Sequence, residues 1–419
     1  MHSSSSPKSE TADILARDSQ YLLPVYARYQ VVMERGEGVY VYDTDGNRYL
    51  DLMAGLGVNG LGHAHARMVK AMAEQAAKMV HLSPQYSSKA SVDLAQRLCE
   101  LSGLSSVFYS TGGSEAVEGA LKLARAYGHK NFGAHKHRVI ALNGSYHGRT
   151  YGSLSVTGQS KYRSDFEPGL PGIDFVDRED LAQLEAAVSG DACCILLEPI
   201  LGEGGVHELS HEYLKRARDL ANRHSALLIF DEIQCGLGRA GDWFAYQASG
   251  VRPDALILGK PLGGGLPLSA LVVDRDLVNT LGVAKHGSTL GGSPMACRMG
   301  VEFLSVMEDD NLLAQIRETG AVLKRELEKL AATSPIAVEA RGRGLIQALE
   351  LNVPGRPIVE AGLKEGLMLN VVQGHILRFL PSFLLTPEHV MEAIPVITRL
   401  LEQEAAKHPA SVATTSTAR

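Results

Sequence analysis

Residues 256–265 read Leu256-Ile-Leu-Gly-Lys260-Pro-Leu-Gly-Gly-Gly265, an apolar run that ends in a lysine followed by glycines. Lysine is rarely buried without a function, and a buried amine can have a lowered pKa and act as a Schiff-base former. A surface lysine in a glycine-rich loop is the alternative interpretation of this stretch taken alone. The stretch therefore predicts an amine at the end of a strand. The role of that amine has to be inferred from the other motifs in the sequence.

Short apolar runs, separated by longer amphipathic segments, extend outward from this stretch. Runs of this length and character are typical of strands that are covered on both faces, so we expect a largely parallel sheet with crossover helices. Ligands of such sheets bind beyond the carboxyl ends of the strands. The runs occupy residues 107–109, 139–142, 193–197, 227–230, 255–258 and 270–273.

Two further motifs follow apolar runs directly. The first is Ser110-Thr-Gly-Gly-Ser-Glu-Ala116, where Gly113 and Ser114 could bind a phosphate at a helix N-terminus. An ordinary serine cap with a glycine turn is the alternative. The second is Asp231, a carboxylate at a strand end that could hold a proton on a ring nitrogen or could cap a helix.

The composition limits the class of protein. The chain has 419 residues, 21% of them charged, and a formal net charge of −6, so we expect two or three structural units and no nucleic-acid partner. Five scattered cysteines favour a reducing compartment, and we expect a cytoplasmic protein. The serine-rich start has no following apolar run, and no apolar run is long enough to span a membrane.

The sequence pattern also predicts the organisation of the chain. His63 and His65 could suggest a metal pair, but a packing or capping role is favoured and no metal is expected. The predicted units are a disordered tail over 1–20, an N-terminal segment over 21–62 that joins the small domain, a large cofactor-binding domain over 63–292, a small C-terminal domain over 293–405 and a disordered tail over 406–419.

Taken together, the motifs resemble those of class III aminotransferases, which belong to the large pyridoxal-phosphate fold family. The resemblance extends from Tyr21 to about Leu401 and implies an α/β fold of type I, with a mostly parallel, seven-stranded type of sheet and a smaller α+β domain. The matching stretches are 112–116, 146–150, 198–203, 231–234, 259–260, 287–292 and 377–381.

The resemblance implies pyridoxal 5'-phosphate as the cofactor and a role for each matched residue. Lys260 would hold the cofactor as a Schiff base and carry the proton, and Asp231 would pair with the pyridinium nitrogen. Thr289 would reach the phosphate from the partner subunit of a homodimer. The other cofactor contacts implied are Gly113, Ser114, Tyr146, His147, Glu198 and Gln234.

The resemblance also implies a substrate site. Arg149 and Arg378 would bind the two carboxylates of glutamate, a task suited to the guanidinium fork. Glu203 would neutralise Arg378 when an amine-terminal substrate occupies the site, and Ser288 would act with Arg149 at the carboxylate end of acetylornithine. A surface ion pair is the alternative for either arginine.

Within the class, residues 21–26, 58–63, 343–345 and 368–370 are most similar to the acetylornithine subfamily. We therefore expect transfer of the ω-amine of N-acetylornithine to 2-oxoglutarate, which gives N-acetylglutamate semialdehyde and glutamate in arginine biosynthesis. Another ω-aminotransferase, acting on ornithine, 4-aminobutyrate, succinyldiaminopimelate or a diamine, is the first alternative. An aminomutase or decarboxylase on the same fold, and a cofactor-binding regulator, are the others.

Overall fold

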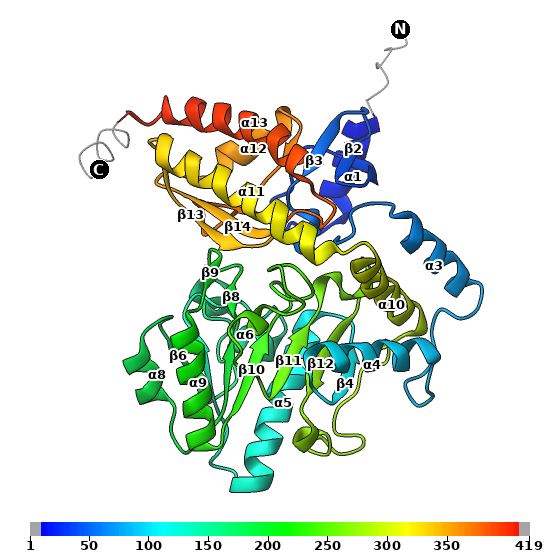
Figure 1. The fold of residues 1–419 in the computed structure, drawn as a ribbon, viewed down its shortest axis with the longest axis vertical. Coiled ribbons are helices and arrows are strands. Elements are labelled where there is room, and N and C mark those ends of the chain that lie inside the picture. The colour runs from blue at the N-terminus through cyan, green and yellow to red at the C-terminus, as the bar shows by residue number, and fades with distance from the viewer. Residues whose placement is uncertain (1–9, 410–419) are drawn as a thin grey trace.

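A seven-stranded sheet forms the centre of the larger lobe, in the lower half of Figure 1. The computed structural model describes residues 10–409. Neighbouring strands are parallel except for β12, which is antiparallel to both β4 and β11, so the predicted α/β class is confirmed. In spatial order the strands are β4 Ser106–Ser110, β12 Ser269–Val273, β11 Ala255–Leu258, β10 Leu227–Asp231, β7 Ala192–Leu197, β5 Arg138–Leu142 and β6 Ile173–Val176.

The central strands of this sheet are buried on both faces, as their apolar sequences predict. Successive residues alternate between two hydrophobic clusters, so that Phe230 belongs to one cluster and Ile229 to the other. Cys193 and Cys194 pack inside β7 as small apolar residues. The helices of this lobe include α4 Lys89–Ser102, α5 Gly113–Phe132, α6 Tyr151–Ser155, α7 Ser160–Arg163, α8 Leu181–Ala187 and α9 His211–His224.

The smaller lobe is an antiparallel four-stranded sheet covered by long helices, at the top of Figure 1. The sheet contains β13 Ala337–Arg343, β14 Ile346–Leu351, β17 Ile376–Phe379 and β16 Asn370–Val372, and the helices are α11 Leu312–Thr333, α12 Arg356–Lys364 and α13 Pro387–Ala405.

The N-terminal segment attaches to the smaller lobe through a second four-stranded sheet. β2 and β3 form an antiparallel hairpin, and Asp43 closes its turn by accepting the backbone N–H of Asn47 at 2.8 Å. β3 pairs in parallel with β15, a strand of the smaller lobe. The strands are β1 Met33–Glu37, β2 Tyr40–Asp43, β3 Arg48–Asp51 and β15 Leu367–Met368.

Part of the expected N-terminal tail is helical. Residues 10–20 lie in helix α1 Glu10–Tyr21, where we expected disorder, because Asp13 pairs with Arg17 one turn later and Thr11 bonds to Thr44 on the neighbouring sheet. At the other end, residues 406–409 continue from α13, and Lys407 and His408 both contact Glu404. The expected tails over 1–9 and 410–419 lie outside the described residues.

Helix α10 Pro294–Asp309 connects the two lobes. It packs against α3 Ala66–Ala76 and α4, so it lies with the larger lobe although the predicted boundary at 293 assigned it to the smaller one. The reason is its apolar composition, since residues such as Met299 and Phe303 are fully buried. The short elements between the long ones are α2 Ala54–Gly57, β8 Ile200–Leu201, β9 His207–Glu208 and the 3-10 turns η1 Ser164–Phe166, η2 Ala245–Ala248, η3 Lys260–Gly263 and η4 Arg275–Leu277.

Within residues 10–409, none of the helices has both the length and the apolar character needed to cross a bilayer.

Candidate active site

The candidate site lies where the carboxyl ends of the parallel strands meet. Asp231 is the last residue of β10, Glu198 follows β7 directly, and Lys260 follows β11 after one glycine. These ends border a cavity of about 170 Å³. Nine of the predicted site residues line it together with two others, giving Gly113, Ser114, Tyr146, His147, Gly148, Glu198, Glu203, Asp231, Ile233, Gln234 and Lys260.

Lys260 supplies a primary amine to this cavity. Burial lowers the pKa of its amine to about 8, with Arg378 also lowering it and the carboxylates of Glu203 and Asp231 acting in the opposite direction. Among residues 10–409, no side chain or backbone group forms a hydrogen bond or ion pair with the amine. A neutral, unpartnered amine is a competent nucleophile and proton carrier near pH 8.

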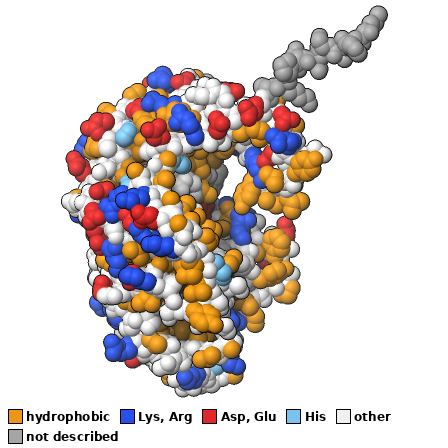
Figure 2. Space-filling view, turned by 90° about the vertical axis from the view of Figure 1, so that its right-hand side faces the viewer, with side chains coloured by type: hydrophobic (Ala, Val, Ile, Leu, Met, Phe, Trp, Pro, Cys, Tyr) orange, Lys and Arg blue, Asp and Glu red, His pale blue; other side chains and the backbone are white. Residues whose placement is uncertain are grey.

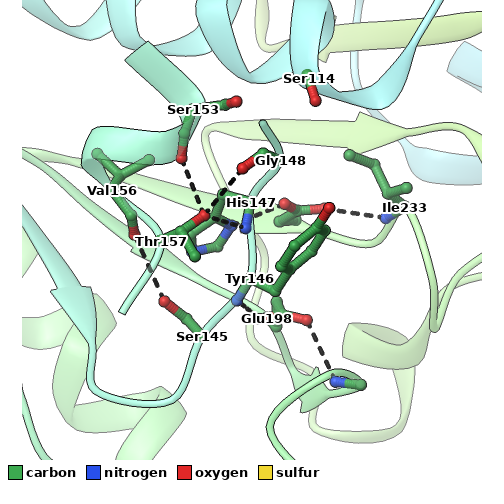
Figure 3. A network of polar contacts seen from close by, with 12 residues as sticks. Ser114, Ser145, Tyr146, His147, Gly148, Ser153, Val156, Thr157, Glu198 and Ile233 are labelled. Atoms are coloured by element: carbon green, nitrogen blue, oxygen red, sulfur yellow. Dashed lines mark hydrogen bonds and ion pairs between the residues drawn. The ribbon is translucent and has the colours of Figure 1, made fainter. Parts of the chain in front are cut away.

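Asp231 and His147, the latter labelled in Figure 3, form a buried pair in the lining of the cavity. The imidazole Nδ1 of His147 lies 2.8 Å from Oδ2 of Asp231, while Oδ1 accepts the backbone N–H of Ile233 at 3.1 Å. Burial lowers the pKa of His147, but the hydrogen bond and the charge of Asp231 outweigh it, so the pKa is raised. The other imidazole nitrogen, Nε2, is buried without a partner in the described structure.

Glu198 ties two segments of the site together. Its carboxylate accepts the backbone N–H of Tyr146 at 2.8 Å and that of Gly202 at 3.2 Å, as Figure 3 shows for both oxygens. Burial raises the pKa of Glu198 to about 7, and the nearby charge of Asp231 adds to this effect. Tyr146 is thereby fixed at the wall of the cavity, where its ring is available for stacking.

The N-terminus of α5 is a candidate anion site. Gly112 is extended and starts the helix, so the N–H groups of Gly113 and Ser114 lack partners within the helix. The side chain of Ile233 packs against Gly113 so closely that a Cβ there would lie 2.8 Å from Ile233 Cδ1. Ser114 Oγ also accepts the backbone N–H of Arg149 at 3.2 Å.

Arg378 approaches the cavity from β17 of the smaller lobe. Its guanidinium is 1% exposed, pairs with Glu203 Oε1 at 2.7 Å and donates to Gln234 Oε1 at 3.0 Å. Its Nε donates to Asn370 Oδ1 at 3.1 Å. Burial raises the pKa of Glu203, but the positive charges of Arg378 and Lys260 outweigh burial and lower it. Glu203 is therefore a carboxylate that occupies the guanidinium.

The other predicted site residues lie around the cavity and do not line it. The exposed guanidinium of Arg149 lies over the ring of Tyr162, 4.2 Å from its centroid. Ser288 Oγ is 3.5 Å from a carboxylate oxygen of Glu115 beside the anion site. Thr289 is exposed to solvent. The structure thus brings Arg149 and Ser288 near the site, while Thr289 does not reach the cavity of its own chain.

Two cavity residues were not assigned a role from the sequence. Gly148 has φ +128, and a Cβ there would lie 2.1 Å from Ser114 Oγ, so only glycine fits between the 146–150 segment and the anion site. Ile233 packs between Gly113 and Gly259. Both lie inside stretches that resemble the family's motifs, 146–150 and 231–234. Their position in those stretches is the sequence feature that could have identified them as site residues.

The groups around the cavity fit pyridoxal phosphate. The start of α5 would hold the phosphate, Tyr146 would lie along the ring, and Asp231 would meet a ring nitrogen. The free amine of Lys260 would meet an aldehyde, and the unpartnered Nε2 of His147 leaves one more polar atom available at the same wall. An α/β fold with this set of groups defines a pyridoxal-phosphate-dependent enzyme.

Comparison with known proteins identifies the family. The model of the aminotransferase class-III family matches residues 24–401, so the chain belongs to that family of pyridoxal-phosphate-dependent enzymes and the resemblance seen in the motifs is confirmed. Acetylornithine aminotransferase of Caldanaerobacter subterraneus subsp. tengcongensis is 38% identical over 93% of this chain and 99% of that protein. The enzyme of the same name from Methanocaldococcus jannaschii is 39% identical over 89% of this chain and 94% of its own length.

Solved structures agree with this assignment. An ornithine aminotransferase from Toxoplasma gondii superposes with a TM-score of 0.92 at 33% identity and covers 96% of this chain and 97% of its own. Acetylornithine aminotransferase from Elizabethkingia anophelis superposes with a TM-score of 0.84 at 28% identity, over 94% of this chain and 99% of its own. The fold is therefore that of pyridoxal-phosphate aminotransferases.

Proposed function

We propose that the enzyme transfers the ω-amine of N-acetylornithine to 2-oxoglutarate. The observation that carries this proposal is the ion pair of the buried Arg378 with Glu203 beside the amine of Lys260. Glu203 can stay paired with Arg378 when the donor has no carboxylate near the guanidinium. It can move away when the acceptor brings a carboxylate to that guanidinium. The names of the curated relatives at 38% and 39% identity support N-acetylornithine as the donor.

The chain's own residues would divide the chemistry among them. Pyridoxal phosphate, when bound, supplies the aldehyde that takes up the amino group and the ring that stabilises charge on the substrate carbon. Lys260 Nζ, neutral near pH 8, would remove the proton from that carbon and return it at the other end of the transfer. Asp231, oriented by His147, would accept a hydrogen bond from a protonated ring nitrogen.

Arg378 and Glu203 would select between the two substrates. While Glu203 neutralises Arg378, the site accepts an alkyl amine without leaving a buried unpaired cation, which costs several kcal/mol. When 2-oxoglutarate binds, its carboxylate would take the place of Glu203 on the guanidinium. Arg149, which lies on the rim over Tyr162, would hold the second carboxylate, with Ser288 near the same end.

The test is glutamate formation from 2-oxoglutarate by the purified, cofactor-loaded protein. N-acetylornithine, ornithine, 4-aminobutyrate and succinyldiaminopimelate are compared as donors, with Lys260→Ala as the inactive control. We expect N-acetylornithine to be preferred and the control to lose all transfer. Preference for ornithine would move the enzyme to that substrate, and transfer to no oxo acid by a yellow, cofactor-bound protein would overturn the aminotransferase proposal in favour of an aminomutase or decarboxylase.

We also propose that the active unit is a homodimer. The segment 21–26 exposes five apolar side chains, and Figure 2 shows hydrophobic groups gathered beside a hollow on one face of the molecule. Tyr21, Leu23 and Tyr26 are 73%, 78% and 74% exposed, an arrangement that a second copy would cover. Thr289, exposed on its own chain, would then reach the phosphate site of the partner. The cytoplasmic location expected from the sequence stays a prediction.

A further inference from the structure

The turn between β16 and β17 contains a strained glutamine. Gln373 has φ +53 and the next residue, Gly374, has φ +81. Two consecutive residues with positive φ are typical of tight hairpin turns, which favour Asn, Asp or Gly because other L-residues are strained there. A glutamine kept in this conformation needs a compensating contact, and its side chain shows where that contact is.

The side chain of Gln373 crosses from the smaller lobe to the larger one. Its Nε2 donates to the backbone oxygen of Glu203 and to Oε1 of Gln159, the latter at 3.0 Å. Its Oε1 accepts from Lys161 Nζ at 3.3 Å. Gln159 is itself buried and donates to the backbone oxygen of Gly144 at 3.0 Å, two residues before Tyr146. Asparagine would suit the turn better, but its side chain is one methylene shorter.

The same hairpin therefore holds Glu203 at two points. Arg378, on β17, binds the carboxylate, and Gln373, in the turn, binds the carbonyl oxygen. Glycines flank Glu203 at 202, 204 and 205, so the chain around it has few side chains of its own to fix it. Without the bond from Gln373, the main chain of Glu203 could shift away from Arg378.

We propose that Gln373 is a positioning residue that anchors the main chain of Glu203, so that Glu203 releases Arg378 by moving its side chain alone. This inference rests on the substrate selection by Arg378 and Glu203 proposed above. Anchoring keeps the closed pair in place for an amine donor and returns the carboxylate to the same position after each glutamate or 2-oxoglutarate has left.

Gln373→Asn is the test variant. Asparagine suits the positive-φ turn, but its shorter side chain cannot reach the carbonyl oxygen of Glu203. The two half-reactions are measured separately, from the absorbance of the bound cofactor, with N-acetylornithine and with glutamate. We expect kcat/KM for N-acetylornithine to fall about fivefold, as for the loss of one neutral hydrogen bond, and kcat/KM for glutamate, which like glutarate needs a free Arg378, not to fall. Lys161→Met, which leaves the bond to Glu203 intact, is the matched control and should change neither value.

Two further measurements separate positioning from a general structural effect. In a Glu203→Ala background, Gln373→Asn should add no further discrimination between the substrates. Glutarate, a dicarboxylate that needs a free Arg378, should bind the Gln373→Asn protein about fivefold more tightly in calorimetry. Equal losses in both half-reactions, an unchanged ratio, or a full effect in the Glu203→Ala background would overturn the inference.

The glutarate measurement also keeps the two proposals distinguishable. If the wild-type protein transfers no amine at all, the proposed function fails, but a change in glutarate affinity on Gln373→Asn still supports the positioning role. If transfer is normal and glutarate affinity is unchanged, the positioning role fails alone.

Discussion

Most charged side chains in the site are paired with one another, and their pairing determines which polar atoms remain free to face the cavity. Asp231 binds one nitrogen of His147 and leaves the other free, and Glu203 binds Arg378. Lys260 is the exception, because its amine has no partner in residues 10–409. An isolated buried ammonium is unfavourable, so burial favours the neutral amine that the chemistry requires.

The first prediction concerns the titration of Lys260. Since burial lowers the pKa of its amine to about 8, the reaction of the cofactor-free protein with pyridoxal phosphate should rise with pH to a midpoint near 8. Below that pH the rate should fall about tenfold per unit, because only the neutral amine attacks. Stopped-flow absorbance between pH 6.5 and 9.5 measures this, with N-acetyl-lysine methylamide as the unburied control. A midpoint above 10 would contradict the prediction.

The second prediction concerns the pair of Asp231 and His147. Asp231→Asn removes the negative charge that would meet the ring nitrogen and leaves His147 without its anionic partner. We expect kcat to fall roughly 100- to 1,000-fold, as for the loss of one preorganised electrostatic contact. Steady-state kinetics measure the fall, and bound-cofactor absorbance verifies that the variant is still loaded. A loss of less than threefold in a loaded protein would show that Asp231 is dispensable.

At the scale of elements, the start of helix α5 provides a direct test of the anion site. A Cβ at Gly113 would lie 2.8 Å from Ile233 Cδ1, whereas a Cβ at Gly112 would meet nothing within 4 Å. Gly113→Ala should therefore weaken pyridoxal phosphate about tenfold or more, since Ile233 must move at the wall of the cavity. Gly112→Ala should stay within about twofold. Equilibrium titration with the cofactor compares them, and equal affinities would contradict the predicted site.

Helix α2 Ala54–Gly57 is a second element that bears on Lys260. Its residues have positive φ, including Leu56 at +63, so this turn winds in the left-handed sense. A Cβ at Gly57 would lie 3.7 Å from Cδ of Lys260 and 3.8 Å from a guanidinium nitrogen of Arg239. The turn thus forms part of the wall behind the lysine. Residues 54–57 were not predicted to contact the site.

At the scale of the whole molecule, a buried arginine joins the two lobes. Arg239 is 1% exposed and donates to the backbone oxygens of Leu345 and Pro381, the former at 3.1 Å, while its guanidinium lies over the ring of Phe383. Burial lowers the pKa of Arg239 to about 9. Because Pro381 follows Arg378 by three residues, this contact also holds the end of the strand that carries the substrate arginine.

The last prediction concerns assembly. Leu23→Asp combined with Tyr26→Asp places charge on the exposed apolar face and should raise the dimer dissociation constant at least about thirtyfold, as for the loss of one strong interface contact. Activity should fall with the dimer, since Thr289 would no longer reach its partner. Met391→Asp, at a side chain 52% exposed on α13, is the matched control. Analytical ultracentrifugation measures both, and a monomeric wild-type protein with full activity would exclude the shared site.

The sequence by itself determined the sheet and the chemistry at its strand ends. Apolar runs of three to five residues must be buried on both faces, and a lysine or aspartate at their ends must then lie at one edge of the sheet. Local composition is sufficient to predict the strands, because the apolar side chains of each run favour burial wherever the run lies in the chain. The same logic located Gly113, Ser114, Asp231 and Lys260, while the resemblance to class III aminotransferases supplied five further cavity residues.

Only the tertiary structure decided the contacts between lobes. The bond from Gln373 to Glu203 joins residues that are 170 positions apart, and the left-handed turn over 54–57 and the placement of α10 are likewise fixed by packing against distant elements. Helix α1 also forms where composition indicated a tail. Such features depend on the balance between local strain and long-range contacts. The pattern of residue types along the chain shows local preferences but not which distant residues come into contact.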